Sequence, residues 1–324
     1  TGKLGEVGVD RLRAEDDIHV DYRPDLEYDE ILACIDGYHG IITRSETPIT
    51  AELIDRATKL KVIARAAVGI ANIDVAHATE KGILVMNTPG KNTNSAAELA
   101  MALLLAAARH VPRAHQTMDQ GGWDRHRFQG TELLGKTLGI VGLATVGHRM
   151  ARFGLGFDMR VIAYDPYIAD AEFERHRVEK VDLDTLLAES DVVSVHTPKN
   201  DETTGMIAAA ELAAMRRGVI VINAARGGIV DEQALLRALD DGHVACAGID
   251  TWSREPMADN PFAEHDRVVM SPHIGASTKE AQVRIGETIA DQVPKALRGG
   301  IVDAPVNMPQ IRVLEGNLMT AYTV

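Results

Sequence analysis

Hydrophobic positions along the chain fall into short β-branched runs separated by longer segments of helical period. The runs Gly40–Thr43, Lys61–Ala64 and Ile83–Asn87 each predict a strand. Between them, the pattern predicts a helix that starts at the N-cap Thr50 and ends near Ala57, and a second helix near Ile73–Glu80. Strands and helices that alternate in this way are typical of a parallel sheet in an α/β fold.

The same alternation starts again near the middle of the chain and runs almost to its end. Before it, Ser95–Arg109 predicts a buried helix because it is apolar nearly all round, and Gln120–Gly130 predicts a loop because it has no period. The charged stretch Asp170–Asp191 is expected to form short helices with a solvated face. Ser277–Arg298 predicts a long helix before an extended piece at Val302–Val306. Strands of this region are predicted at Thr137–Val141, Arg160–Tyr164, Val192–His196, Val219–Asn223, Ala245–Asp250 and Val268–Ser271.

Length and charge restrict the classes of function. The chain has 324 residues, enough for two domains of ordinary size. Its 34 basic and 47 acidic residues give a formal net charge of 34 − 47 = −13, and the basic residues are scattered. Nucleic acid is therefore not expected as a partner. An anionic substrate would have to be bound by local positive groups that act against the charge of the whole chain.

Cysteine usage and the apolar runs bear on metal sites, compartment and membranes. The two cysteines, Cys34 and Cys246, are far apart, so we expect neither a zinc cluster nor a disulfide framework, and we predict no metal site. No secretory leader is recognisable, so the cytoplasm is the expected compartment. The longest apolar run, Leu99–Ala108, has 10 residues, which is too few to cross a bilayer.

A glycine-rich turn follows the predicted strand Thr137–Val141. It reads Gly142-Leu-Ala144-Thr-Val-Gly147, close to the G-x-G-x-x-G pattern, in which the second glycine admits a pyrophosphate and the third allows close helix–strand packing. Asp165 lies 23 residues after Gly142, where a carboxylate binds ribose hydroxyls and repels a 2′-phosphate. The turn therefore predicts a dinucleotide site that favours NAD. The alternative is a glycine-rich turn in an unrelated α/β domain.

Arg226, Glu255 and His273 each follow the end of a predicted strand. Ligands bind at that edge of open α/β sheets. Oxidation of a 2-hydroxy acid requires such a set, because an imidazole can accept the hydroxyl proton, a carboxylate can fix the tautomer of the imidazole, and a guanidinium can grip the substrate carboxylate. Taken singly, each residue has an ordinary structural interpretation, and His273 is one of 12 histidines. Only their joint arrangement favours catalysis.

Several stretches resemble the signatures of a known family. The segments TELLGKTLGIVGL, HTPKNDETTGMI, NAARGGIVDE, DTWSREP and SPHIGASTKEA are similar to those of the D-isomer-specific 2-hydroxyacid dehydrogenases. IITRSETPIT, ARAAVGIANID, MNTPGKNTNSAAELAMALLLAAAR and IVDAPVNMP resemble in particular the members that oxidise D-3-phosphoglycerate with NAD, the first step of serine synthesis. The resemblance runs from about residue 3 to the end of the chain and implies this activity.

The resemblance also implies a fold of two Rossmann-like or flavodoxin-like parallel-sheet domains with a cleft between them. A discontinuous substrate-binding domain would comprise residues 1–92 and 284–324, and an NAD-binding domain residues 93–283. The helices Ser95–Arg109 and Ser277–Arg298 would be the crossing points about which the cleft closes. Because members are commonly dimers, a homodimer or higher homo-oligomer is implied, with the loop around Trp123 as an arm.

Roles for individual residues follow from the same resemblance. Arg226 would bind the substrate carboxylate, Glu255 would pair with the imidazole, and His273 would be the catalytic acid and base. Arg44 and Arg65 would join Arg226 in binding a phosphorylated 2-hydroxy acid. The NAD contacts would come from Gly142, Thr145, Val146 and Gly147 in the glycine turn, from Asp165, and from Val68, His196, Thr197, Pro198, Ala224, Ala225, Asp250, Gly275 and Ala276.

Four positions depart from the family pattern, which bears on cofactor affinity and on local loop shape. Ala67 and Ala144 stand where glycine is usual, Ala71 where aspartate is usual, and Thr145 where arginine is frequent. The three catalytic candidates are intact. Two alternatives stay open: a reductase of another 2-oxo acid such as glyoxylate or hydroxypyruvate, and an NAD-sensing binding protein similar to a corepressor.

Both ends of the sequence predict a piece of a longer enzyme. The first residues, TGKLGEVGVDRL, read as a helix without the strand that a βαβ unit needs ahead of it. The last residues, EGNLMTAYTV, resemble the start of the regulatory region that follows in many members of the family.

Overall fold

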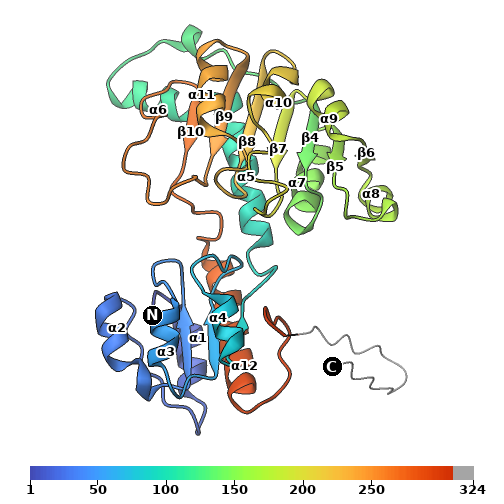
Figure 1. Cartoon of the computed structure of the whole chain (residues 1–324). Coiled ribbons are helices and arrows are strands. Elements are labelled where there is room, and N and C mark those ends of the chain that lie inside the picture. The colour runs from blue at the N-terminus through green and yellow to red at the C-terminus, as the bar shows by residue number, and fades with distance from the viewer. Residues whose placement is uncertain (309–324) are drawn as a thin grey trace. The chain divides into compact units, whose positions relative to one another are not determined.

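The computed structural model describes residues 1–308, which divide into two compact units (Figure 1). Of the described residues, the first unit contains Thr1–Lys91 and 279–308, and the second contains Asn92–Thr278. Each unit is built on its own parallel sheet, so the predicted α/β class with two parallel sheets is confirmed. The terminal segment EGNLMTAYTV lies outside the described residues.

The first unit has a three-stranded sheet in the order β1-β2-β3, all parallel. The predicted strand at Gly40–Thr43 is confirmed, the next is shifted by one residue toward the C-terminus, and the third is shorter than predicted by one residue at each end. Its strands are β1 (Gly40–Thr43), β2 (Val62–Arg65) and β3 (Leu84–Met86), and its helices are α1 (Glu6–Arg13), α2 (Tyr28–Cys34), η1 (Ile35–Gly37), α3 (Ala51–Arg56), α4 (Val75–Glu80) and α12 (Lys279–Leu297).

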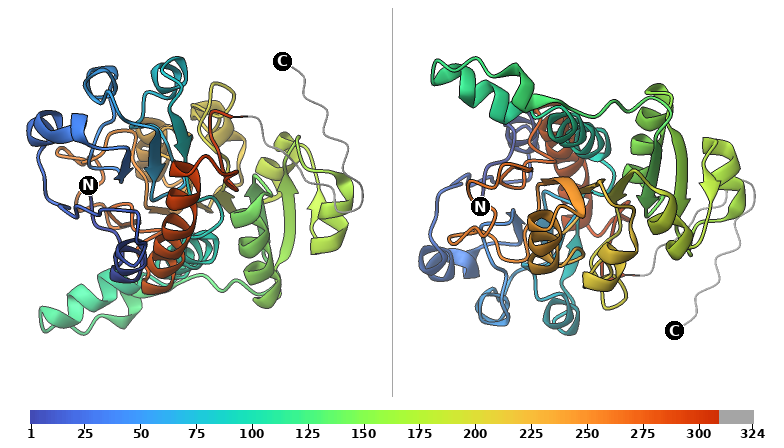
Figure 2. Two further views of the ribbon diagram at one scale, coloured as in Figure 1. Left: turned by 90° about the horizontal axis from the view of Figure 1, so that it is seen from below. Right: turned by 90° about the horizontal axis from the view of Figure 1, so that it is seen from above.

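Two apolar layers cover the two faces of this sheet. One layer joins Leu12 of α1 and Ile289 of α12 to the sheet, and the other contains Ile31 of α2 and Leu53 of α3. The helices α1 and α12, blue and red in Figure 2, pack closely because glycines meet at their crossing. A Cβ atom on Gly8 would lie 2.7 Å from the Cα atom of Gly286.

The second unit has a seven-stranded parallel sheet in the order β10-β9-β8-β7-β4-β5-β6. Across the sheet, β5 and β6 follow β4 on one side, and β7 to β10 follow one another on the other side. The strand order therefore reverses between β4 and β7. Its strands are β4 (Thr137–Val141), β5 (Arg160–Tyr164), β6 (Glu179–Lys180), β7 (Val192–Val195), β8 (Val219–Asn223), β9 (Val244–Ile249) and β10 (Val268–Met270). Its helices are α5 (Thr93–Ala108), α6 (Val111–Asp119), η2 (Arg125–Phe128), α7 (Thr145–Gly156), α8 (Asp170–His176), α9 (Leu183–Glu189), α10 (Ala209–Ala214) and α11 (Glu232–Asp240).

The crevice at such a reversal is the usual ligand site of an open α/β sheet. The predicted bounds of β4, β5 and β8 agree with the structure, and the predicted loop at Gln120–Gly130 contains a single turn of 3₁₀ helix. The charged stretch Asp170–Asp191 forms the expected short helices but also the two-residue strand β6. In residues 1–308, none of the helices has both the length and the apolar character that a membrane span requires.

Candidate active site

Three candidate side chains stand at one edge of the second sheet. Arg226 follows β8, Glu255 follows β9 and His273 follows β10, and these strands are neighbours in the sheet. All three strands run parallel, so their carboxyl ends lie at the same edge. The sheet topology therefore gathers residues that are 47 positions apart in sequence.

His273 and Glu255 form a direct pair. His273 Nδ1 lies 2.7 Å from Glu255 Oε2, and the other carboxylate oxygen accepts a hydrogen bond of 2.9 Å from the backbone N–H of Trp252. His273 has a left-handed backbone (φ 54°), and its N–H donates to the carbonyl of Asp250. A carboxylate at Nδ1 places the ring proton there and leaves Nε2 as the acceptor of the neutral imidazole.

Asp250 holds the segment that carries His273. Its side chain is fully buried, and Oδ1 accepts hydrogen bonds from the Ser271 hydroxyl (2.6 Å) and the N–H of Ile274 (2.8 Å). The N–H of Gly275 donates to Oδ2 at 2.9 Å. A buried carboxylate with several donors is strongly held, so it fixes the backbone on both sides of His273. Asp250 thus orders the loop in which Gly275 and Ala276 lie.

Arg226 is placed by the glycine that follows it. A Cβ atom on Gly227 would lie 1.8 Å from the carbonyl carbon of Trp252, so only glycine lets the loop after β8 touch the turn that carries Glu255. The guanidinium of Arg226 donates to the carbonyl of Ala225 at 2.7 Å. Burial lowers the pKa of Arg226, and the negative charge of Glu255 opposes that shift. A half-buried cation thus lies beside the His273–Glu255 pair.

The glycine turn lies where the strand order reverses. Gly142 follows β4 with φ +94°, and a Cβ atom there would lie 2.8 Å from Thr197 Cγ2, just after β7. A Cβ atom on Gly147 would lie 2.1 Å from the carbonyl oxygen of Gly142. These two positions therefore require glycine for the turn and for the close approach of α7 to β4. Ala144 has φ −70°, which alanine adopts without strain, and it precedes α7 as its N-cap.

Asp165 lies beside this turn. Its carboxylate is buried, and Oδ2 accepts a hydrogen bond of 2.8 Å from the N–H of Leu143. The other oxygen accepts from the N–H of Tyr167 at 3.0 Å. Each carboxylate oxygen has a second acceptor site, so hydroxyl donors can still bind there. The N-terminus of α7, with Thr145 and Val146 in its first turn, presents backbone N–H groups beside it.

The segment after β7 contributes buried polar atoms. His196 is buried and hydrogen-bonded through Nε2 to the Ser194 hydroxyl at 2.8 Å, and burial lowers its pKa to about 4. The His196 imidazole is therefore neutral at pH 7. Within residues 1–308, the hydroxyls of Thr197 and Thr251 are buried without a hydrogen-bond partner. Pro198 O, Ala224 and Ala225 lie along the same edge of the sheet.

The remaining candidates belong to the first unit. Arg44 follows β1 and Arg65 ends β2, and Thr43 pairs with Arg65 in the parallel ladder. Both cations therefore lie at the carboxyl edge of that sheet. Arg44 Nη1 donates to the carbonyl of Lys3 (2.8 Å) and to Gln282 Oε1 (2.7 Å), and Arg65 Nε donates to the carbonyl of Gly69 (2.9 Å). The carbonyl of Val68 accepts from the Asn87 side chain at 2.7 Å.

The comparison with protein families identifies the second unit. Residues 101–275 match the model of the D-isomer specific 2-hydroxyacid dehydrogenase, NAD binding domain. This match covers more than half of the chain. The chain belongs to this dehydrogenase family. Its second unit is accordingly an NAD-binding domain.

Individual relatives support the same assignment. The chain is 43% identical over 320 residues to a D-3-phosphoglycerate dehydrogenase of Archaeoglobus fulgidus, a match that covers 98% of this chain and 60% of that protein. It is 45% identical over 293 residues to the D-3-phosphoglycerate dehydrogenase of Mycobacterium tuberculosis, covering 90% of this chain and 56% of that protein. The chain thus spans little more than half the length of these curated relatives.

A solved structure to which the chain is similar contains NAD. The D-lactate dehydrogenase of Aquifex aeolicus, complexed with NAD and lactic acid, is 29% identical and superposes with a TM-score of 0.78, covering 86% of this chain and 90% of that one. In the present chain, the residues fit such a dinucleotide. Gly142 places no side chain between the turn and Thr197, the N-terminus of α7 can bind a phosphate, and the Thr197 hydroxyl, unpartnered within residues 1–308, can donate to it.

Glu232 is a site residue that sequence reasoning missed. It lies in the first turn of α11, and its carboxylate accepts from the N–H (2.6 Å) and the hydroxyl (2.8 Å) of Ser253. It thereby anchors the turn that carries Glu255. The sequence offered one weak signal, an acidic residue directly after the helix cap Asp231 in NAARGGIVDE. That signal is explained equally well by the helix dipole.

A histidine cluster on α7 and α8 is the group in the described part of the chain whose composition suits a metal. Ligand atoms of His148, Glu172 and His176 all lie within 4.8 Å of one another. The rings of the two histidines are stacked, with centroids 3.9 Å apart and planes inclined by 23°. A metal lies near the plane of each imidazole that binds it, so stacked rings do not converge on one ion. We assign the cluster to the packing of α8 on α7.

Proposed function

We propose that this chain carries the catalytic part of a D-3-phosphoglycerate dehydrogenase, which oxidises D-3-phosphoglycerate to 3-phosphohydroxypyruvate. The observation that carries the proposal is the contact of 2.7 Å between His273 and Glu255 beside Arg226, at the edge of an NAD-binding domain. The relatives named above, with 43% and 45% identity, support the choice of substrate.

Each side chain has a definite part in this reaction. When bound, NAD supplies the hydride acceptor. His273 Nε2 takes the proton of the substrate hydroxyl, because Nδ1 is occupied by Glu255. Glu255 stabilises the resulting imidazolium and fixes the ring, and its own orientation comes from the N–H of Trp252. Arg226 binds the substrate carboxylate through two parallel hydrogen bonds and so fixes the carbon that is oxidised.

The phosphate requires further cations. With a formal net charge of −13, the chain repels a phosphorylated acid at long range, so binding depends on local positive groups. Arg44 and Arg65, at the ends of neighbouring strands, are the groups we assign to the substrate phosphate. Asp165 is assigned to the ribose hydroxyls of NAD, where its negative charge disfavours a 2′-phosphate.

A steady-state assay with NAD and D-3-phosphoglycerate tests the proposal. We expect turnover that His273→Ala lowers by about 10³-fold, since general base catalysis contributes about 10²–10⁴-fold. His115→Ala is the matched control, because His115 also lies near a carboxylate, 3.6 Å from Asp119, but on the exposed helix α6. Absence of turnover at any NAD concentration would refute the function, and full activity of His273→Ala would refute the assignment of the base.

A second candidate is the reduction of an unphosphorylated 2-oxo acid. The structural likeness to a D-lactate dehydrogenase bound to NAD and lactic acid favours it. Arg44→Ala distinguishes the two, because loss confined to the phosphorylated substrate supports the phosphate assignment. Equal loss on glyoxylate or hydroxypyruvate would contradict it.

We also propose that the chain forms a homodimer or higher homo-oligomer through the loop around Trp123. The Trp123 side chain is 81% exposed, and a large exposed aromatic residue is typical of an interface. Sedimentation of the wild type and of Trp123→Ser tests this proposal, and a monomer at micromolar concentration in both would overturn it. Location in the cytoplasm stays a prediction.

A further inference from the structure

Asn223 is the last residue of β8 and lies three positions before Arg226. The residue is only 3% exposed, so its polar side-chain atoms need partners within the protein. Nδ2 donates to the carbonyl of Arg226 at 3.0 Å, and Oδ1 accepts from the N–H of Ala225 at 3.2 Å. Both partners belong to the turn that carries Arg226, so the Asn223 side chain braces this turn from within.

The two bonds from Asn223 enclose the peptide group that joins Ala225 to Arg226. One bond holds the N–H that precedes this peptide group, and the other holds the carbonyl that follows it. The carbonyl of the enclosed peptide, which is that of Ala225, accepts from Arg226 Nη1 at 2.7 Å. Asn223 therefore orients the acceptor that in turn holds the guanidinium.

The bond from Nη1 leaves a particular edge of the Arg226 guanidinium available. Nε and Nη2 share an edge with two parallel N–H groups, which match the two oxygens of a carboxylate. Within residues 1–308, neither Nε nor Nη2 of Arg226 forms a hydrogen bond or an ion pair. The turn thus engages the nitrogen that lies off this edge and leaves the edge itself for a ligand.

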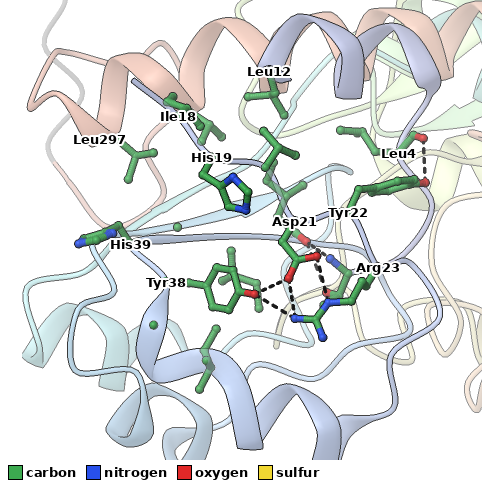
Figure 3. Close-up of a pocket in the computed structure, with 18 of the residues that line it drawn as sticks. Leu4, Leu12, Ile18, His19, Asp21, Tyr22, Arg23, Tyr38, His39 and Leu297 are labelled. Atoms are coloured by element: carbon green, nitrogen blue, oxygen red, sulfur yellow. Dashed lines mark hydrogen bonds and ion pairs between the residues drawn. The ribbon is translucent and has the colours of Figure 1, made fainter. Parts of the chain in front are cut away.

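Two other arginines of the chain bind carboxylates through the same edge. Nε and Nη2 of Arg23 lie 3.1 and 2.7 Å from the two oxygens of Asp21 (Figure 3). Nε and Nη2 of Arg160 bind the two oxygens of Glu179 at 3.0 and 2.9 Å, while its Nη1 donates to another carboxylate at 2.7 Å. Arg226 resembles Arg160 in that its Nη1 has an acceptor, but no carboxylate of the described chain binds its edge.

The backbone of Asn223 links the turn of Arg226 to the loop of His273. The carbonyl of Asn223 accepts from the N–H of Asp250 at 3.0 Å, and the carbonyl of Asp250 accepts from the N–H of His273 at 2.8 Å. Asn223 ends β8, and Asp250 directly follows the neighbouring strand β9. Each of these two buried side chains braces one loop, so the guanidinium and the imidazole are held from the same pair of strand ends.

We propose that Asn223 is a positioning residue for the reaction, which turns the Nε–Nη2 edge of Arg226 toward the carboxylate of the 2-hydroxy acid. The proposal rests on the proposed role of Arg226 in binding that carboxylate. Asn223 acts through the Ala225 carbonyl rather than by contact with the substrate. Without its two bonds the turn loses its brace, Nη1 loses a fixed acceptor, and the substrate carboxylate meets a cation that is no longer oriented.

A double-mutant cycle with Arg226→Ala tests the proposal. The measured quantity is the Kd of oxalate for the chain saturated with NADH, followed by NADH fluorescence, because oxalate offers a carboxylate without a phosphate. We expect Asn223→Ala to raise this Kd at least about tenfold, since orientation of the binding group is lost. In the Arg226→Ala background, the same substitution should raise it less than about twofold, because the two residues act as one unit.

Asn223→Asp is a second variant that leaves no cavity. It keeps the acceptor for the N–H of Ala225 but replaces the donor to the Arg226 carbonyl with an oxygen, so it should weaken oxalate binding as well. It takes the place of Asn223→Ala in the cycle if the alanine variant does not fold.

Asn307→Ala is the matched control. Asn307 likewise holds backbone groups with both atoms, since Oδ1 accepts from the N–H of Val85 at 2.9 Å and Nδ2 donates to the carbonyl of Ile83 at 2.8 Å. These bonds lie in the first unit, at the start of β3. We expect a loss of stability but a change of less than about twofold in the Kd of oxalate, because a purely structural loss does not turn Arg226.

An equal rise in the Kd of oxalate with and without the Arg226 side chain would overturn the proposal, because Asn223 would then act by another route. Oxalate binding by Arg226→Ala that is as tight as in the wild type would also overturn it, as would a wild type that does not bind millimolar oxalate. A wild type that binds oxalate but does not turn over D-3-phosphoglycerate refutes the proposed substrate instead. The cycle on oxalate still decides the role of Asn223 in that case.

Discussion

Gly227→Ala tests whether backbone contact between two loops sets the catalytic geometry. The added Cβ atom would lie 1.8 Å from Trp252 C, 1.9 Å from its oxygen and 2.3 Å from Ser253 N. Ordinary contact begins at 3.4 Å, so the two loops must separate by about 1.6 Å. The clash falls on backbone atoms of both loops, so no side-chain rotation relieves it. Arg226 lies on one loop and Glu255 on the other, and their separation therefore increases.

The expected magnitude follows from this displacement. A misplacement of about 1 Å lowers an oriented reaction by roughly 10²-fold. We therefore expect kcat/KM for D-3-phosphoglycerate to fall by about 10²-fold, which corresponds to roughly 2.7 kcal/mol of transition-state stabilisation. The overpacked contact should also lower the free energy of unfolding by about 1–3 kcal/mol. The Kd of NAD should change less than kcat/KM does, because the glycine turn after β4 and Asp165 after β5 lie outside the two displaced loops, although the predicted NAD contacts Ala224 and Ala225 lie next to Arg226.

Steady-state kinetics, a fluorescence titration with NAD and urea unfolding measure these three quantities. Gly156→Ala is the matched control: it ends α7, nothing lies within 4 Å of the added Cβ atom, and φ is not positive there. We expect it to leave kcat/KM unchanged and to raise stability by about 0.5–1 kcal/mol. A folded Gly227→Ala protein with kcat/KM within threefold of the wild type would refute the reasoning.

Three further predictions concern other parts of the NAD-binding domain. Glu232→Gln should lower kcat about tenfold with an unchanged Kd for NAD, because it weakens two hydrogen bonds to Ser253. Glu211→Gln, which weakens only the hydrogen bond from the N–H of Ala208 at the start of α10, should leave kcat unchanged. A change in the Kd of NAD alone for Glu232→Gln would contradict this reasoning. Ala144→Gly should lower the Kd of NAD about threefold by calorimetry, since glycine caps α7 better than alanine and removes a methyl group from the turn that we propose binds the pyrophosphate; weaker binding would argue against it. His196 has a pKa of about 4 in the folded chain, below 6.5, so the unfolded state binds the proton first and stability is lost as pH falls from about 6.5 to 4. About 2 kcal/mol should be lost between pH 8 and pH 5 in urea unfolding, and His196→Asn should remove that loss.

The sequence predicted the order of elements well because periodicity reports local geometry. Gly40–Thr43, Thr137–Val141 and Val219–Asn223 are strands at the predicted bounds, since each is a short β-branched run between breakers. The N-cap role of Thr50 is also confirmed, as its hydroxyl accepts from the N–H of Leu53 at 3.3 Å. The two-residue strand β6 escaped prediction because Glu179–Lys180 carries no apolar pattern.

The sequence could not predict contacts between loops that are far apart along the chain. The position of Arg226, Glu255 and His273 after strand ends suggested one edge, but nothing in the residues gave the order β10-β9-β8 that makes the strands neighbours. The role of Gly227 depends on an approach to Trp252 that only the folded backbone reveals. Glu232 escaped for the same reason, because its partner Ser253 is 21 positions away.

The hydrogen bond between Asp165 and Leu143 restricts how cofactor preference can evolve. The carboxylate to which we assign the exclusion of a 2′-phosphate also accepts from a buried N–H of the glycine turn. Replacement by alanine would leave that N–H without an acceptor, at a cost of about 1–3 kcal/mol. A route to NADP therefore passes through residues that keep an oxygen at this place, such as asparagine or serine, before an arginine is added nearby. A substitution of Asp165 that changes cofactor selectivity therefore also changes the stability of the fold.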